Sequence, residues 1–170
     1  PQYLQDNAVY YWRVLASDAR TNETIAGPFS FAVNTNEERP LSFNLVSPRD
    51  TSETPSVTPT LRWCASQDPD PLDTLEYTVY LDTVSAFSNP TLFSGLSDTV
   101  LVLSSPLQEN QSYFWKVKAQ SQDTADFTWS NEQNWQFLVN AVNEAPNQFA
   151  LVLPTDAAVL ADNSVSFDWQ

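Results

Sequence analysis

Several residue types are rare or missing in this chain of 170 residues. It has no histidine and no methionine, two glycines and a single cysteine, Cys64. Without histidine, no serine or cysteine nucleophile can be activated by an imidazole base, and no imidazole can bind a metal. Two glycines cannot form a glycine-rich phosphate loop, and one cysteine cannot form an intrachain disulfide. We therefore predict that the chain is not an enzyme.

Positive charge is also scarce. Seven basic residues stand against 21 acidic ones, for a net charge of -14. Such a surface repels phosphates and anionic lipid head groups, so we expect no nucleic-acid partner and no membrane insertion. No apolar run approaches the length of a membrane span. The charge favours cations as partners.

What the chain does contain is a repeat. The segment Tyr10–Ala16 (YYWRVLA) returns as Tyr113–Ala119 (YFWKVKA), at a spacing of 113 - 10 = 103. A second block returns without insertion at a spacing of 106: Pro40, Phe43, Leu45, Pro48, Asp50, Leu61 and Trp63 match Pro146, Phe149, Leu151, Pro154, Asp156, Phe167 and Trp169. A fixed period of this kind indicates a tandem array of one folding unit.

The period divides the chain into one complete repeat and two partial ones. A unit of about a hundred residues is an ordinary size for a domain with its own core. We predict the C-terminal part of one repeat over residues 1–35, a complete repeat over 40–140 and the N-terminal part of a further repeat over 143–170. Both ends are then expected to be cuts through a longer protein.

The local patterns predict strands. Tyr113, Trp115, Val117 and Ala119 alternate with Phe114 and two lysines, which is the period of a half-buried strand. Turn clusters such as Gln67–Pro71 separate similar segments, and no stretch carries a helical apolar stripe. Short strands at regular spacing predict an all-β antiparallel sandwich.

These residues carry a resemblance to a known family. The order Leu-x-Trp (61–63), an Asp-Pro-Asp loop (68–70), Tyr-x-Val (77–79) and Leu-x-x-Asn-x-x-Tyr-x-Trp-x-Val-x-Ala (107–119) resembles fibronectin type III repeats of the bacterial extracellular type. The resemblance implies tandem immunoglobulin-like (fibronectin type III) seven-stranded β-sandwiches. It places strands at Phe43–Val46, Thr58–Cys64, Leu75–Asp82, Thr91–Ser94, Thr99–Leu103, Ser112–Gln120 and Asn134–Asn140. It also implies a hydroxyl-to-backbone bond at Tyr113, and core positions for Trp12, Trp63, Trp115 and Trp169.

Carboxylates gather where two units should meet. Asp68, Asp70 and Asp73 lie in the loop after the second predicted strand, which faces the linker and the preceding unit. The linker contributes Glu37 and Glu38, and the preceding unit contributes Asp6. Converging carboxylates suit calcium, which takes six to eight oxygen ligands. The simpler interpretation is that Asp and Pro form turns here, so calcium is a candidate and no cofactor is required.

Some aromatic residues alternate with the predicted core residues along a strand and are therefore expected to face outward. If Trp115 points inward, Phe114 points outward with Tyr80 beside it, and Tyr11 repeats the feature. Trp129 falls in an inserted loop before the last strand. Such a surface serves packing against neighbouring units or binding of a sugar, and we favour packing.

We therefore predict a structural segment, a spacer, stalk or filament component, of a long extracellular or cell-surface bacterial protein. Its partners would be neighbouring repeats and copies of itself. The alternative is an adhesin or a glycan-binding accessory module of a secreted enzyme.

Overall fold

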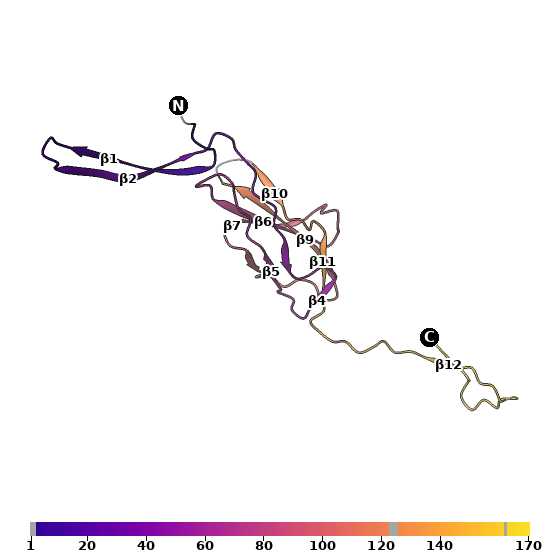
Figure 1. The fold of residues 1–170 in the computed structure, drawn as a ribbon. Coiled ribbons are helices and arrows are strands. Elements are labelled where there is room, and N and C mark those ends of the chain that lie inside the picture. Colours follow the sequence, from indigo (N-terminus) through magenta and orange to yellow (C-terminus); the bar gives the residue numbers. More distant parts are fainter. Residues whose placement is uncertain (1–2, 123–125, 162) are drawn as a thin grey trace.

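The chain is all-β in the computed structural model, which describes residues 3–122, 126–161 and 163–170 (Figure 1). Strands make up 43% of it, and the described residues contain no helix. Among them, accordingly, no helix is long and apolar enough to cross a bilayer.

Thirteen strands follow one another along the described chain. They are β1 (Ala8–Ser17), β2 (Glu23–Val33), β3 (Leu45–Ser47), β4 (Ser52–Thr54), β5 (Thr60–Trp63), β6 (Leu75–Asp82), β7 (Thr91–Leu96), β8 (Val100–Val102), β9 (Ser112–Ser121), β10 (Phe127–Trp129), β11 (Trp135–Val139), β12 (Leu151–Leu153) and β13 (Asp168–Trp169).

The central part of the chain forms two sheets around one core. One sheet has the order β3-β5-β8, and the other has the order β4-β11-β9-β6-β7 with β10 also paired to β9. The inward residues alternate along each strand, as in β9, where every second side chain is buried. Both sheets contribute to the core, which contains Phe43, Leu45, Leu61, Trp63, Tyr77, Val79, Leu81, Leu103, Trp115, Val117, Ala119, Phe137 and Val139.

The predicted strands over residues 40–140 match the observed ones closely, with two differences. The first predicted strand continues after Pro48 as β4, which leaves its sheet and pairs in parallel with β11 on the other. The last predicted strand begins earlier than expected, because β10 and β11 pair in succession along the same edge of β9. Residues 131–134 interrupt that pairing.

The sequence analysis predicted that Trp129 lies in an inserted loop, and this prediction is wrong because Trp129 lies in strand β10. It pairs with Lys118 in β10, and the next residue continues the pairing through Ser130 N–H to the Val117 carbonyl at 2.8 Å. Of the three extra residues, one lies before Trp129 and two lie after it, because the offset is 103 at Leu15 and Lys118, 129 - 25 = 104 at Trp129 and 135 - 29 = 106 at Trp135. A repeat offset shows that an insertion exists but does not show which backbone hydrogen bonds it interrupts.

The segment before the sandwich is a long hairpin. Strands β1 and β2 pair with each other and with no other described strand, and they extend away from the sandwich (Figure 1). Their register repeats that of β9 and β11: Tyr10 pairs with Phe31 as Tyr113 pairs with Phe137. Both aromatic pairs are stacked, with ring centroids 5.6 Å and 6.0 Å apart.

Two of the four predicted core tryptophans are not buried. Trp63 and Trp115 are 3% and 0% exposed, as predicted, but Trp12 is 49% exposed and Trp169 is 63% exposed. The prediction is wrong for Trp12 and Trp169 because β1–β2 and β12–β13 are separate two-stranded sheets. Among the described residues no second sheet covers either tryptophan.

Candidate functional site

The predicted acidic cluster lies where the hairpin meets the sandwich. Carboxylate oxygens of Glu37, Asp70 and Asp73 lie within 4.8 Å of one another. The linker supplies Glu37, and the loop between β5 and β6 supplies the other two. The turn that carries them is held locally, since Asp73 N–H bonds the Asp70 carbonyl and the Asp73 carboxylate accepts from Ser121 Oγ at 2.9 Å.

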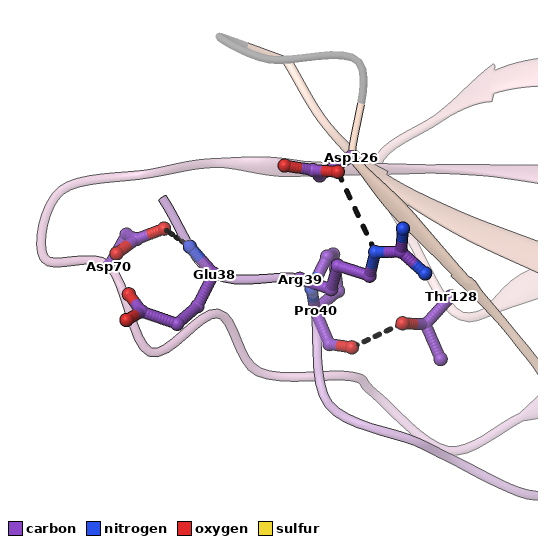
Figure 2. A network of polar contacts seen from close by, with 6 residues as sticks. All are labelled: Glu38, Arg39, Pro40, Asp70, Asp126 and Thr128. Atoms are coloured by element: carbon purple, nitrogen blue, oxygen red, sulfur yellow. Dashed lines mark hydrogen bonds and ion pairs between the residues drawn. The ribbon is translucent and has the colours of Figure 1, made fainter. Parts of the chain in front are cut away.

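The linker is attached to the sandwich at several points, which Figure 2 shows from close by. Glu38 N–H donates to Asp70 Oδ2 at 2.8 Å, and Thr128 Oγ1 donates to the Pro40 carbonyl at 2.5 Å. Arg39 faces Asp126 with 3.7 Å between Nε and Oδ1, an exposed ion pair that contributes little stability. The backbone and side-chain hydrogen bonds therefore fix this end of the linker.

Asn34 adds an amide to the cluster. In the side-chain orientation that satisfies both of its polar atoms, Asn34 donates to Asp70 Oδ1 at 3.0 Å and to the Asn36 carbonyl at 2.6 Å. This orientation is assigned from the hydrogen-bond network. An amide that donates to a buried carboxylate offsets part of the cost of its burial, and Asp70 is only 3% exposed.

The other predicted carboxylates take different positions. Asp68 accepts the Asp70 N–H on Oδ1 at 3.2 Å, while its buried Oδ2 has no donor among the described residues. Glu38 turns its side chain toward Asn7, and Asp6 accepts from Thr35 N–H and from the Asn36 amide. The structure thus brings Glu37, Asp70 and Asp73 together, with Asp68 beside them.

Several carboxyl groups of this cluster have a raised pKa, chiefly through removal from water or a hydrogen bond and secondly through nearby like charges. Removal from water and then repulsion by Asp70 and Asp73 raise the pKa of Glu37. The pKa of Glu38 is raised chiefly by its hydrogen-bonding contact with the Asp70 carboxyl. Burial raises the pKa of Asp68, whereas hydrogen bonds from Thr35 lower the pKa of Asp6. Carboxylates held this close repel one another when ionised, and a bound cation would relieve that repulsion. The oxygen donors fit a hard cation such as calcium.

Asp6 and Asn7 belong to an arrangement that occurs twice. Asn7 has a positive φ of 53° and donates from Nδ2 to Glu38 Oε2 at 3.1 Å. Asn110 has a φ of 56° and donates from Nδ2 to Glu144 Oε1 at 3.1 Å. The two asparagines are 110 - 7 = 103 residues apart and the two glutamates 144 - 38 = 106, the two offsets of the sequence repeat. Asparagine is among the residues that tolerate this left-handed conformation.

The acidic residue before each asparagine completes the arrangement. Asp6 Oδ1 accepts from Thr35 N–H at 2.6 Å, and Glu109 Oε1 accepts from the N–H groups of Ala141 and Val142 at 2.8 Å and 3.0 Å. We call each set a linker clamp; the first consists of Asp6, Asn7 and Glu38, and the second of Glu109, Asn110 and Glu144. The sequence signal was present, because an asparagine precedes each repeated aromatic strand at the same distance.

A tyrosine lies next to each linker clamp. Tyr113 accepts a hydrogen bond on its hydroxyl from Gln108 N–H at 2.9 Å, which confirms the predicted hydroxyl-to-backbone bond. Tyr10 accepts from Gln5 N–H at 2.7 Å in the same way. These bonds fix the turn that carries each clamp asparagine.

The predicted aromatic surface is only partly assembled. Tyr80 and Trp129 lie edge to face with centroids 4.9 Å apart. Tyr80 is opposite Lys116 in the sheet, while half-buried Phe114 is opposite Asp82. Tyr11 lies on the distant hairpin and is 76% exposed. The prediction missed Phe87 and Phe127, because nothing in their local sequence indicates which sheet face they approach.

Neither a scan against models of known protein families nor a search of curated proteins finds a match to this chain.

Proposed function

We propose that the chain is a non-catalytic structural segment of an extracellular or cell-surface protein, built from tandem fibronectin type III-like sandwiches over residues 1–35, 40–140 and 143–170. In this role each unit acts as a spacer, and the linkers set the angle between successive units. The observation that carries the proposal is the linker clamp, which recurs with the same partners at the two offsets of the repeat.

The clamp is suited to a spacer because it restrains the backbone where one unit ends. Side-chain acceptors for linker N–H groups replace water as their partner, so the linker loses freedom at its first residues. The Glu38 N–H bond to Asp70 then ties the far end of the same linker to the next unit. A linker bonded to both units transmits force and orientation, whereas a free one would not.

Two further features support this proposal over an enzyme or an adhesin. Sheet order β3-β5-β8 against β11-β9-β6-β7 is the order expected of a fibronectin type III-like unit, with β4 as an additional edge strand beside β11. The predicted binding aromatics Tyr80 and Trp129 contact each other edge to face rather than forming an open strip.

The test is a comparison of domain orientation in solution. Small-angle scattering and residual dipolar couplings of the full chain would be measured for the wild type and for Asn7→Ala, with Asn131→Ala as the matched control. Asn131 is an exposed asparagine that bonds Asn44 away from both linkers. We expect Asn7→Ala to broaden the distribution of hairpin orientations and the control to leave it unchanged. Equal distributions in all three proteins would refute the spacer role of the clamp.

A further inference from the structure

The hairpin β1–β2 and the strand pair β12–β13 are register copies of two parts of the central sandwich. In β12–β13, Leu151 pairs with Trp169, as Leu45 pairs with Trp63 in β3–β5, and a shift of register follows each pair. The offsets are 151 - 45 = 106 and 169 - 63 = 106. The hairpin in turn repeats the register of β9 with β11.

In the central sandwich these two parts cover each other. Leu45 and Trp63 from β3 and β5 belong to the same buried cluster as Trp115 and Phe137 from β9 and β11. The two parts lie in different sheets, so their side chains meet across the core. The central sandwich therefore shows which surface fits the inner face of a β9–β11 pair.

The equivalent surfaces of the hairpin and of β12–β13 are exposed. Tyr10 stacks on Phe31 and Trp12 lies against Phe29, with ring centroids 5.6 Å and 5.3 Å apart, so the hairpin presents four rings on one face. The strand pair presents the counterparts of the core residues in β3–β5. On the two surfaces together, six aromatic side chains are 43–69% exposed: Trp12, Phe29, Phe31, Phe149, Phe167 and Trp169.

The size and charge of these surfaces suit a reversible contact. A buried aromatic side chain removes about 150–250 Å² from water, so six rings that are about half exposed offer about 450–750 Å². A standard stable interface buries about 1,200–2,000 Å². Residues 8–33 contain two arginines and two acidic residues, for a net charge of 2 - 2 = 0, so the hairpin does not repel the three acidic residues of 146–170.

The two surfaces of one chain are kept apart. Figure 1 shows the hairpin and β12 beyond opposite ends of the central sandwich. The first linker is held to the sandwich by the Glu38 N–H bond to Asp70 and by the Thr128 bond to the Pro40 carbonyl. The strand pair that covers a hairpin therefore comes from another molecule.

We propose that the aromatic face of the hairpin binds β12–β13 of a second copy of the chain, packed as β3–β5 packs on β9 and β11. The two surfaces differ, so the contact is heterologous, and copies add head to tail. The contact names a partner for the proposed structural segment and rests on its repeat organisation. It does not depend on the linker clamps.

The test is sedimentation velocity of the full chain over a wide range of concentrations. Phe31→Asp disables the hairpin face, and Trp169→Asp disables the strand pair. Leu92→Asp is the matched control, because it adds the same charge at an exposed apolar residue of β7 that belongs to neither surface. Circular dichroism melting of the central sandwich shows whether each variant is folded.

We expect the average mass of the wild type and of Leu92→Asp to rise with concentration beyond that of a dimer. Phe31→Asp alone and Trp169→Asp alone should each stay monomeric. A mixture of these two variants should form a complex of two copies and nothing longer, because only one intact hairpin face and one intact strand pair remain to meet.

Four results would overturn the proposal: a wild type that stays monomeric, a mixture that forms no complex, association of either single variant alone, or equal loss in Leu92→Asp. Association of Trp169→Asp alone would assign the contact to two hairpins, and association of Phe31→Asp alone would assign it to two strand pairs. A monomeric wild type would leave the spacer role intact, since the orientation test with Asn7→Ala is made within one chain.

Discussion

Replacing Trp12 and Trp115, which occupy the same position of the repeat, tests where the hydrophobic core lies. Trp12 and Trp115 are equivalent in sequence, yet one is 49% exposed and the other 0% exposed. A tryptophan buries up to about 150–250 Å². At about 25 cal/mol per Å², Trp115→Ala removes about 4–6 kcal/mol of burial energy, which is an upper bound.

One contribution acts in the opposite direction. The indole N–H of Trp115 is buried and has no acceptor among the described residues. Removing an unpaired buried donor returns about 1–3 kcal/mol. The expected net loss from Trp115→Ala is therefore about 1–5 kcal/mol in the free energy of unfolding. For a domain of this size that lowers the melting temperature by about 4–8 °C per kcal/mol.

Urea and thermal unfolding followed by far-UV circular dichroism measure this loss without depending on tryptophan emission. Trp12→Ala is the control, and it should leave the main unfolding transition unchanged because the hairpin contributes no core residue to the sandwich. If Trp115→Ala does not fold, Trp115→Phe should still show a smaller loss. Equal shifts for Trp12→Ala and Trp115→Ala would refute the placement of the core within residues 40–140.

Three other outcomes are expected. The pKa values of Glu37 and Asp68 are raised in the folded chain, so their contribution to stability is present below the ordinary carboxyl pKa and is lost as the pH rises through the raised values. Thermal melts from about pH 4 to pH 7 should show this loss of stability. The double variant Glu37→Gln with Asp68→Asn should show a smaller dependence on pH. Calcium should raise the melting temperature of the wild type by several degrees, chelation should reverse the shift, and Asp70→Asn should show no response. Identical melting curves with and without calcium would refute the prediction of a calcium site at Glu37, Asp70 and Asp73. Tyr113→Phe should cost about 0.5–1.5 kcal/mol in urea unfolding through loss of the Gln108 bond, whereas no change would mean that the hydroxyl is equally well bonded to water.

The sequence by itself determined the all-β class and most strand positions. Alternation of apolar and polar residues is a local property with a period of two, and it marks a strand at Tyr77, Val79 and Leu81. The resemblance to fibronectin type III repeats placed that strand over Leu75–Asp82, where β6 is observed. The equal spacing of Asn7 and Asn110 from the duplicated strand is visible in the sequence, but their contacts with the linkers are visible only in the structure. In the same way, carboxylates in a turn and in a linker predicted the meeting of Glu37, Asp70 and Asp73.

Only the tertiary structure decided what each side chain meets. Trp12 and Trp115 are equivalent in the repeat and were both predicted to be buried, but burial depends on a second sheet, which covers β9 and, among the described residues, does not cover β1. Likewise, Trp129 became part of a sheet face because β10 pairs with β9, and hydrogen bonds between strands distant in sequence are not encoded in local periodicity. The rarity of lysine, glycine and histidine limited the chemistry available to this chain, and the fold then placed both of its lysines among aromatic rings on one face.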